Sequence, residues 1–446
     1  MVYDSLVYDP LHNSKLNSHQ PSNDAYWLTT ESIIEYPKLT DNLNADVVII
    51  GGGYTGLSCA IHLAKQGIKD IVVLEANHIG WGCSGRNAGF VLPGSGRLGY
   101  NQLVKRFGMQ ATQILHNDYM EAIDLVESLS SQTNSDIDKT EHGYLKLAHS
   151  AKWFSKLSAS AEYLHKNFNY EVELISKTDF QQKYVDHKKV YGAIRYKNGY
   201  GLNPLKLINS YAKLATELGV KIYAQSSVER IEHGKPHHVF TDSGSVKADK
   251  LVMATNGYTP QKMQSELQNK ILPVLTSVIV TEPMSEQQKQ EANFNTQQVM
   301  MDTRELKYYY RQLNDNRILF GGRGAISGKQ ALNPKYPQRL LTELHQSFPA
   351  LKNINIEHQW IGWISVAMDQ MPHIYGTKDN VYYSTGYCGS GVSFTSLAGK
   401  QMADLIVGKQ VDSPLITELP KFPLAPFRRL GQGAFYQWGR FKDWLG

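Results

Sequence analysis

The sequence predicts an α/β protein with a second domain of the α+β type. Its 446 residues are enough for two domains, each with its own core. Near the start, the apolar run 47–50 leads into a glycine-rich turn and a helical pattern, as expected for a buried parallel strand and its crossover helix. Residues 261–361 alternate between short strands and turn residues, which indicates an antiparallel sheet.

The glycine-rich turn has the spacing G-x-G-x-x-G, and each glycine has its own physical role. Gly51 permits the tight turn, Gly53 lets a pyrophosphate approach the backbone, and Gly56 lets helix and strand pack closely. The start of the helix offers N–H groups and the positive end of its dipole to phosphates. The turn therefore predicts a phosphate-binding site.

A second apolar strand, 71–74, ends at Glu75, at about the spacing of an acid that hydrogen-bonds ribose hydroxyls. This acid would repel a 2′-phosphate, so NADP is disfavoured. The order of strand, glycines, helix, strand and acid predicts a Rossmann-like dinucleotide site, which also includes Thr55 and Ala76. The alternative is a glycine-rich turn in an ordinary α/β protein.

A second loop of small residues, 82–89, directly follows this strand. Its backbone is able to lie against a ligand, and Arg86 is able to neutralise a phosphate. A surface loop with a solvated arginine is the alternative. The predicted contacts in this loop are Gly82, Ser84, Gly85, Arg86, Asn87, Ala88 and Gly89.

These loops and two later segments resemble the D-amino-acid-oxidase-type FAD-dependent oxidoreductases, a family that includes glycine, sarcosine and γ-glutamylputrescine oxidases. The SGRNxG form of the second loop is most similar to the γ-glutamylputrescine oxidase branch. The resemblance extends from about Asp46 to Gly408. It implies a Rossmann-like FAD-binding domain in three parts (45–100, 199–260, 362–412) and an antiparallel-sheet substrate domain in two (141–198, 261–361). An N-terminal leader (1–44), a helical segment (101–140) and a C-terminal tail (413–446) complete the chain.

The resemblance also implies further FAD contacts. The backbone of Val228 is expected to contact adenine, although Val228 is equally well explained as a core valine. A strand end resembling the family's ATG motif, with Asn256 inserted, and a glycine-rich loop before the last helix are expected to contact the cofactor. These two segments contribute Thr255, Asn256, Gly257, Gly389, Gly391, Val392 and Ser393.

The flavin is expected to be bound non-covalently. Sarcosine oxidase-like members tether FAD through a cysteine, and Gly362 stands at the position that matches it here. The N-terminus of the last helix would stabilise the negative charge of the reduced flavin.

Candidate catalytic residues come from the strands of the second domain and from the ATG-like segment. Tyr308 and Tyr310 share one face of a strand, and one face of this strand is expected to look into the substrate cavity. We select Tyr310 and Tyr258 as catalytic candidates, with Arg323 as the group that binds a substrate carboxylate. Aromatic packing on the sheet and a surface or structural arginine are the alternatives.

Composition narrows the class of protein. The formal net charge of +5 favours neither a nucleic-acid binder nor an acidic-tail protein. Three cysteines without metal-ligand spacing predict neither a disulfide framework nor a metal site. The polar N-terminus and the absence of an apolar run of about 20 residues predict a cytoplasmic protein. The aromatic, basic tail is expected to pack onto the protein, and contact with a membrane surface is the alternative.

The expected activity is oxidation of the C–N bond of an amine to an imine, which water hydrolyses to an aldehyde or keto product. Molecular oxygen would reoxidise the flavin and release H2O2. A γ-glutamylated polyamine is the favoured substrate, as in polyamine catabolism, and an amino acid is second. Two alternatives remain open: a dehydrogenase that passes electrons to a quinone or a partner protein, and a flavin-binding subunit without turnover.

Overall fold

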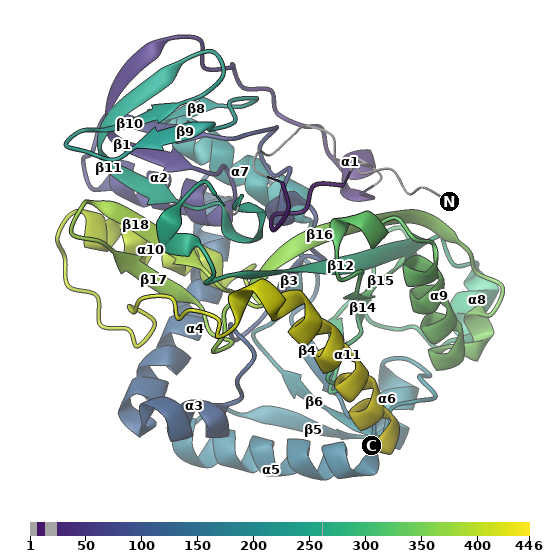
Figure 1. Ribbon diagram of the computed structural model, residues 1–446. Coiled ribbons are helices and arrows are strands. Elements are labelled where there is room, and N and C mark those ends of the chain that lie inside the picture. Colours follow the sequence, from purple (N-terminus) through teal and green to yellow (C-terminus); the bar gives the residue numbers. More distant parts are fainter. Residues whose placement is uncertain (1–6, 14–24, 261) are drawn as a thin grey trace.

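The computed structural model describes residues 7–13, 25–260 and 262–446. Two eight-stranded sheets dominate this part of the chain, and they lie side by side in Figure 1. This arrangement confirms the predicted α/β fold class.

The first sheet is mainly parallel and has the strand order β17-β18-β11-β1-β2-β8. Its strands are β1 (Asn42–Ile50), β2 (Ile71–Leu74), β8 (Lys221–Tyr223), β11 (Ser245–Met253), β17 (His373–Gly376) and β18 (Val381–Thr385). In addition, β10 (His237–Phe240) pairs with β11, and β9 (Arg230–Glu232) pairs with β10. Ile50, the last residue of β1, pairs with Leu74 of β2 and Met253 of β11. The loops that follow these three strands therefore meet at one edge of the sheet, where ligands bind in such folds.

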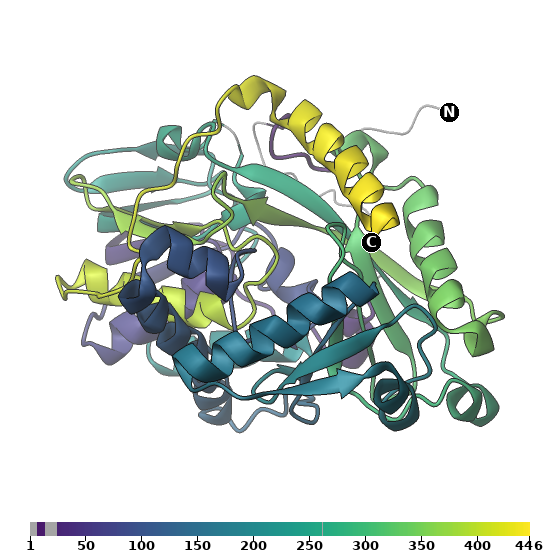
Figure 2. The same cartoon turned by 90° about the horizontal axis from the view of Figure 1, so that it is seen from below.

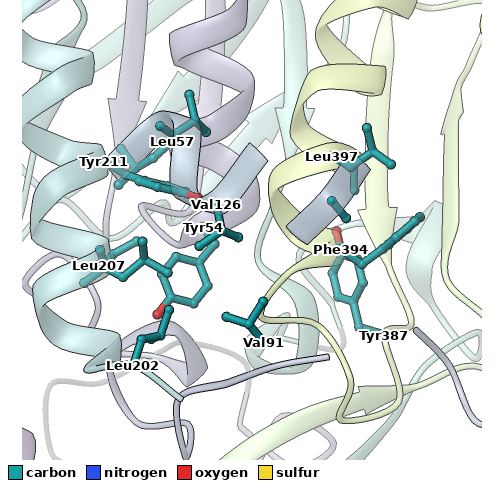
Figure 3. Close-up of a cluster of buried hydrophobic side chains, with 14 of the residues drawn as sticks. Tyr54, Leu57, Val91, Val126, Leu202, Leu207, Tyr211, Tyr387, Phe394 and Leu397 are labelled. Carbon is teal, nitrogen blue, oxygen red and sulfur yellow. The ribbon is translucent and has the colours of Figure 1, made fainter. Parts of the chain in front are cut away.

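Helices pack beside this sheet and form the main core. They are α2 (Tyr54–Lys65), α4 (Met109–Ser131), α7 (Pro204–Glu217) and α10 (Phe394–Ile406). Figure 3 shows Tyr54 and Leu57 of α2 beside Leu207 and Tyr211 of α7. Gly399 of α10 lets α10 and α2 approach each other closely, since a Cβ on Gly399 would lie 2.6 Å from the Cβ of Ser58 in α2. This close packing fixes the N-termini of α2 and α10 relative to each other.

The second sheet has the order β16-β12-β15-β14-β13-β4-β6-β5. Its strands are β4 (Tyr144–Leu147), β5 (Val172–Ser176), β6 (Gly192–Tyr196), β12 (Leu272–Thr281), β13 (Val299–Asp302), β14 (Tyr309–Gln312), β15 (Ile318–Arg323) and β16 (Ile356–Val366). Every neighbouring pair is antiparallel except β13 with β4. That one parallel pairing joins two segments that are far apart in the sequence.

The remaining elements cover the sheets or connect them. They are α1 (Trp27–Thr30), α3 (Tyr100–Phe107), α5 (Ala151–Phe168), α6 (Lys177–Lys183), α8 (Glu286–Glu291), α9 (Lys335–Ser347), α11 (Arg428–Leu445) and the strand pair β3 (Phe90–Val91) and β7 (Tyr200–Gly201). In Figure 2, the view from below, α11 lies along the outside of the molecule. Within the described ranges, no helix combines the length and apolar character needed to cross a membrane.

One difference from the sequence predictions has a clear physical reason. The helix expected over 101–130 is divided into α3 and α4 because Gly108 adopts φ +83°, which interrupts the helical path. Aromatic residues of the leader contact the loops around the site: Trp27 Nε1 donates to the carbonyl of Asn87 at 2.9 Å, and the hydroxyl of Tyr8 donates to the carbonyl of Tyr258 at 2.8 Å. Tyr3, another aromatic residue of the leader, lies outside the described residues.

Candidate active site

A first cavity lies at the carboxyl edge of the parallel sheet. Ile50 and Leu74, the last residues of β1 and β2, form part of its wall. The residues predicted to contact a cofactor that line it are Gly51, Gly53, Thr55, Glu75, Ala76, Gly82, Ser84, Asn87, Val228, Thr255, Asn256, Gly389, Gly391 and Val392. Segments from five parts of the sequence thus meet around one space.

The glycines after β1 have the roles that the sequence indicates. Gly51 adopts φ +110°, and a Cβ there would lie 2.7 Å from the carbonyl oxygen of Ala254. A Cβ on Gly56 would lie 2.1 Å from the carbonyl oxygen of Gly51, so this glycine lets α2 start directly against the strand. The N-terminus of α2 faces the cavity through Gly53 and Thr55. Its dipole and backbone N–H groups favour a phosphate there.

The second glycine-rich loop folds directly onto the first. The Oγ of Ser84 accepts a hydrogen bond from the backbone N–H of Tyr54 at 3.0 Å. A Cβ on Gly53 would lie only 2.9 Å from the same Oγ. The two loops therefore form one continuous wall.

Glu75 lies buried in the wall of the first cavity. Its carboxylate accepts hydrogen bonds from the backbone N–H groups of Gly52 at 2.9 Å and Asn77 at 3.0 Å. Burial raises the pKa of Glu75, and these two N–H groups act in the opposite direction. The two bonds hold the acid in place at the end of β2, where a ribose hydroxyl is expected.

The last glycine-rich loop closes the first cavity from the side of β16. Gly389 adopts φ +92°, and a Cβ there would lie 3.2 Å from the side chain of Ile364. Thr395, in the first turn of α10, also lines the cavity. The N-termini of two helices, α2 and α10, thus open on the same space.

A second cavity adjoins the first. Both are lined by Cys83, Asn87, Ile364, Gly389 and Val392. The second lies between the glycine-rich loops and the second sheet, whose strands contribute Thr276, Val278 and Met301. A molecule in the first cavity is therefore able to meet a molecule in the second at these shared residues.

The second cavity is strongly cationic. Arg86, Arg97, Lys307 and Arg323 line it, and none of the described residues in its wall is Asp or Glu. Burial, together with the charges of Lys146, Arg97 and Arg323, lowers the pKa of Lys307 to about 7. A wall with several cations and no acid among its described residues favours an anionic ligand.

The structure corrects the prediction for Tyr310. Its ring is 1% exposed in the core under the second sheet, stacked on Phe320 with ring centroids 5.3 Å apart. Alternation along the strand was predicted, but the cavity lies on the opposite face, which carries Tyr309 and Lys307. Gly321 of β15 pairs with Tyr309 of β14 and makes room for the ring of Tyr309, since a Cβ on Gly321 would lie 2.1 Å from that ring.

The other two catalytic candidates lie in different cavities. Arg323, at the end of β15, lines the second cavity, as a carboxylate-binding group requires. Tyr258 lines the first cavity instead, with its ring 5.4 Å from that of Trp81. Its hydroxyl accepts a hydrogen bond from the backbone N–H of Trp363 at 3.2 Å. The structure thus places Tyr258 in the wall of the cofactor cavity and away from the cationic cavity.

Eight of the predicted cofactor residues do not line the first cavity. Arg86, Ala88 and Gly362 line the second one. Gly56, Gly85, Gly89, Gly257 and Ser393 line neither and serve packing or turns. A Cβ on Gly89 would lie 1.9 Å from the carbonyl oxygen of Leu202, and the hydroxyl of Ser393 donates to the carbonyl of Leu92 at 2.8 Å. Small residues in a loop thus indicate a tight backbone as often as a ligand contact.

The sequence analysis did not single out three residues that line the second cavity: Arg97, Lys307 and Tyr309. Alternation from Tyr308 and Tyr310 already places Lys307 and Tyr309 together on the other face, so only the choice of face was wrong. No local pattern marks Arg97, which comes from the loop before α3.

The first cavity fits an FAD molecule in its chemistry. It offers the N-terminus of α2 for phosphates, the N-terminus of α10 for the negative charge of a reduced flavin, and a fixed carboxylate for a ribose. Ser226, Ser227 and Val228 line the same cavity, and the backbone N–H of Ser226 donates to the backbone carbonyl of Glu75 at 2.9 Å. Its other end meets the second cavity, where a reactive ring would have to meet a substrate.

Comparison with known proteins agrees with this chemistry. The FAD dependent oxidoreductase (DAO) family model matches residues 46–405. The chain is 32% identical to the γ-glutamylputrescine oxidoreductase of Escherichia coli (strain K12) over 429 residues, which cover 94% of this chain and 98% of that protein. It is 26% identical to the sarcosine oxidase subunit beta of Rhizobium meliloti (strain 1021), over 81% of this chain and 84% of that one.

Solved structures show the same fold. The crystal structure of glycine oxidase from Geobacillus kaustophilus matches with a TM-score of 0.68 at 19% identity, over 86% of this chain and 98% of that one. The L-proline dehydrogenase from P. horikoshii matches with a TM-score of 0.68 at 21% identity, over 84% and 96%.

The family match and the relatives define an FAD-dependent oxidoreductase. The chain belongs to the FAD dependent oxidoreductase (DAO) family, among the relatives of amine and amino-acid oxidases.

Proposed function

We propose that this flavoenzyme oxidises an amine that also carries a carboxylate, with a γ-glutamylputrescine-like compound as the favoured substrate and an amino acid as the second. The observation that carries this proposal is the second cavity, with four cationic side chains and no Asp or Glu among the described residues that line it. A carboxylate matches this charge, and guanidinium groups bind carboxylates through paired hydrogen bonds. The 32% identity to a γ-glutamylputrescine oxidoreductase supports the favoured substrate.

The same charges favour the reactive form of the amine. Only the neutral amine has the lone pair that assists loss of hydride from its α-carbon. Nearby cations lower the pKa of a bound ammonium, so the cavity favours the neutral amine near pH 7. Arg97 and Arg323 would hold the carboxylate, and the wall shared by the two cavities would direct the α-carbon toward the cofactor. Bound FAD would supply the acceptor for the hydride, which carries both electrons of the oxidation, and the proton lost from the nitrogen would pass to solvent.

We propose non-covalent binding of FAD and reoxidation by O2. In the described part of the chain, only Cys83 and Cys388 place a thiol in the walls of these cavities. Burial raises the pKa of each thiol to about 12, which keeps both protonated and poorly nucleophilic. A dehydrogenase with a quinone or protein acceptor is the second candidate.

The proposal is tested by mixing the oxidised enzyme anaerobically with γ-glutamylputrescine, putrescine, glycine and sarcosine while flavin absorbance is followed. We expect γ-glutamylputrescine to bleach the flavin with an apparent dissociation constant at least about tenfold lower than that of putrescine, which lacks a carboxylate. Equal values for the two would contradict the carboxylate site, and no bleaching by any amine would contradict amine oxidation. Stoichiometric H2O2 after admission of air would separate the oxidase from the dehydrogenase.

A further inference from the structure

The C-terminal helix α11 exposes an apolar face that none of the described residues covers. The exposed side chains on this face and just before it are Phe427 (58%), Leu430 (70%), Trp438 (45%), Phe441 (57%), Trp444 (79%) and Leu445 (62%). At about 100° per residue these positions fall on one side of the helix, opposite the buried Gln432, Tyr436 and Gly439.

The buried side of α11 is firmly attached to the protein. The carboxylate of Asp443 accepts hydrogen bonds from the backbone N–H groups of Glu305 at 2.7 Å and Leu306 at 3.1 Å. The guanidinium of Arg97 lies 5.6 Å from the ring centroid of Phe435. Because these contacts fix the inner side, the apolar outer side is a stable feature of the surface. Figures 1 and 2 both show α11 on the outside of the second sheet.

Charge on α11 is distributed as an anionic surface would require. Arg440 and Lys442 are exposed and flank the apolar face on its two sides, and the ammonium of Lys442 lies 4.7 Å from the ring centroid of Trp438. Asp443 is the only acid in the helix, and it points inward. Two copies of the chain meeting through this face would bring their flanking cations together, which disfavours a dimer.

We propose that α11 docks this protein on an anionic lipid bilayer surface. The helix has 18 residues and a length of about 27 Å, and it would lie in the plane of the interface with its tryptophans at the level of the headgroups. The 305–307 turn and Arg97, which contact α11, also reach the second cavity. Docking therefore brings the cationic cavity close to the membrane. This inference does not depend on the identity of the amine.

The test is co-sedimentation of the flavin-loaded protein with vesicles of phosphatidylcholine alone or mixed with phosphatidylglycerol, at low and high salt. We expect binding to the mixed vesicles that weakens with salt. The double variant Phe441→Ser with Trp444→Ser should bind at least about tenfold more weakly. The variant Arg440→Glu with Lys442→Glu should lose the preference for anionic lipid. Leu332→Ser, at an exposed apolar residue outside α11, should bind like wild type.

Several outcomes would overturn the proposal. The first is wild-type protein that stays in the supernatant with mixed vesicles. The second is a double variant at Phe441 and Trp444 that binds these vesicles as strongly as wild type. The third is a doubling of mass with protein concentration, without lipid, that this double variant abolishes. The last result would assign the face to a second copy of the chain. Flavin absorbance and the melting temperature verify that each variant is folded, and all substituted side chains are exposed.

Discussion

Replacement of Lys307 by Met tests the chemistry of the cationic cavity. Lys307 is half-buried in its wall, where burial and three neighbouring cations lower its pKa to about 7. Below pH 7 it is therefore an ammonium that attracts a carboxylate, and above pH 7 it becomes neutral. Guanidinium groups in general remain charged throughout this range. The affinity for a carboxylate should then fall as the pH rises through 7.

The size of the effect follows from this pKa. The charged fraction of Lys307 falls from about 90% at pH 6 to about 3% at pH 8.5. A charge-assisted hydrogen bond contributes about 1.5–3 kcal/mol, which is about 10- to 150-fold in affinity. Together these values predict a dissociation constant about 7- to 25-fold higher at pH 8.5 than at pH 6.

The assay is titration of the oxidised enzyme with glutarate, a dicarboxylate without an amine, followed by the change in flavin absorbance from pH 6 to 8.5. Wild type should show the predicted rise, Lys307→Met should bind weakly with little pH dependence, and Lys307→Arg should bind tightly at every pH. The reasoning would be refuted if wild type and Lys307→Met showed the same pH dependence.

Three further predictions concern stability, the strand face and the cofactor. The pKa of Lys307 is about 10.5 in the unfolded chain and about 7 in the folded protein, so its charge destabilises the fold below pH 7 and this penalty fades toward pH 10.5. Lys307→Met should therefore stabilise the apoprotein at pH 7 by a few kcal/mol at most, measured by thermal unfolding. Tyr310→Phe should leave kcat/KM within about twofold of wild type, whereas Gly321→Ala, which displaces Tyr309 toward the cavity, should lower kcat/KM about tenfold or more. A larger loss of kcat/KM in Tyr310→Phe than in Gly321→Ala would restore Tyr310 as the catalytic residue. Acid precipitation should release all flavin into the supernatant, and flavin that stays in the pellet of wild type but not of Cys83→Ser would show a covalent link.

Local patterns predicted the phosphate and ribose end of the first cavity because the residues that form this end lie close together in the chain. Gly51 and Gly56 are required by close approaches within a single strand–turn–helix unit, and the acid Glu75 ends the next strand. The parallel sheet then follows from the length and apolar content of its strands. Such information is contained in neighbouring residues, so one sequence is enough to find it.

The second cavity depends on contacts between distant segments, which a single sequence does not specify. Alternation groups Tyr308 with Tyr310 and Lys307 with Tyr309, but only the packing of α9 and β15 decides which pair is buried. Arg97 reaches the cavity because α11, more than 300 residues later, supports it through Phe435. The break at Gly108 shows the same limit, since a glycine in a helical pattern is compatible with either a continuous or a divided helix.

The central claim is that cofactor and substrate occupy two cavities that meet at Cys83, Ile364 and Gly389. A crystal structure of the flavin-loaded protein with bound glutarate is the most direct measurement of this claim. We expect the flavin ring at these shared residues and one glutarate carboxylate within hydrogen-bond distance of Arg97, Lys307 or Arg323. A flavin ring at the Glu75 end of the first cavity, or glutarate bound outside the second cavity, would contradict it.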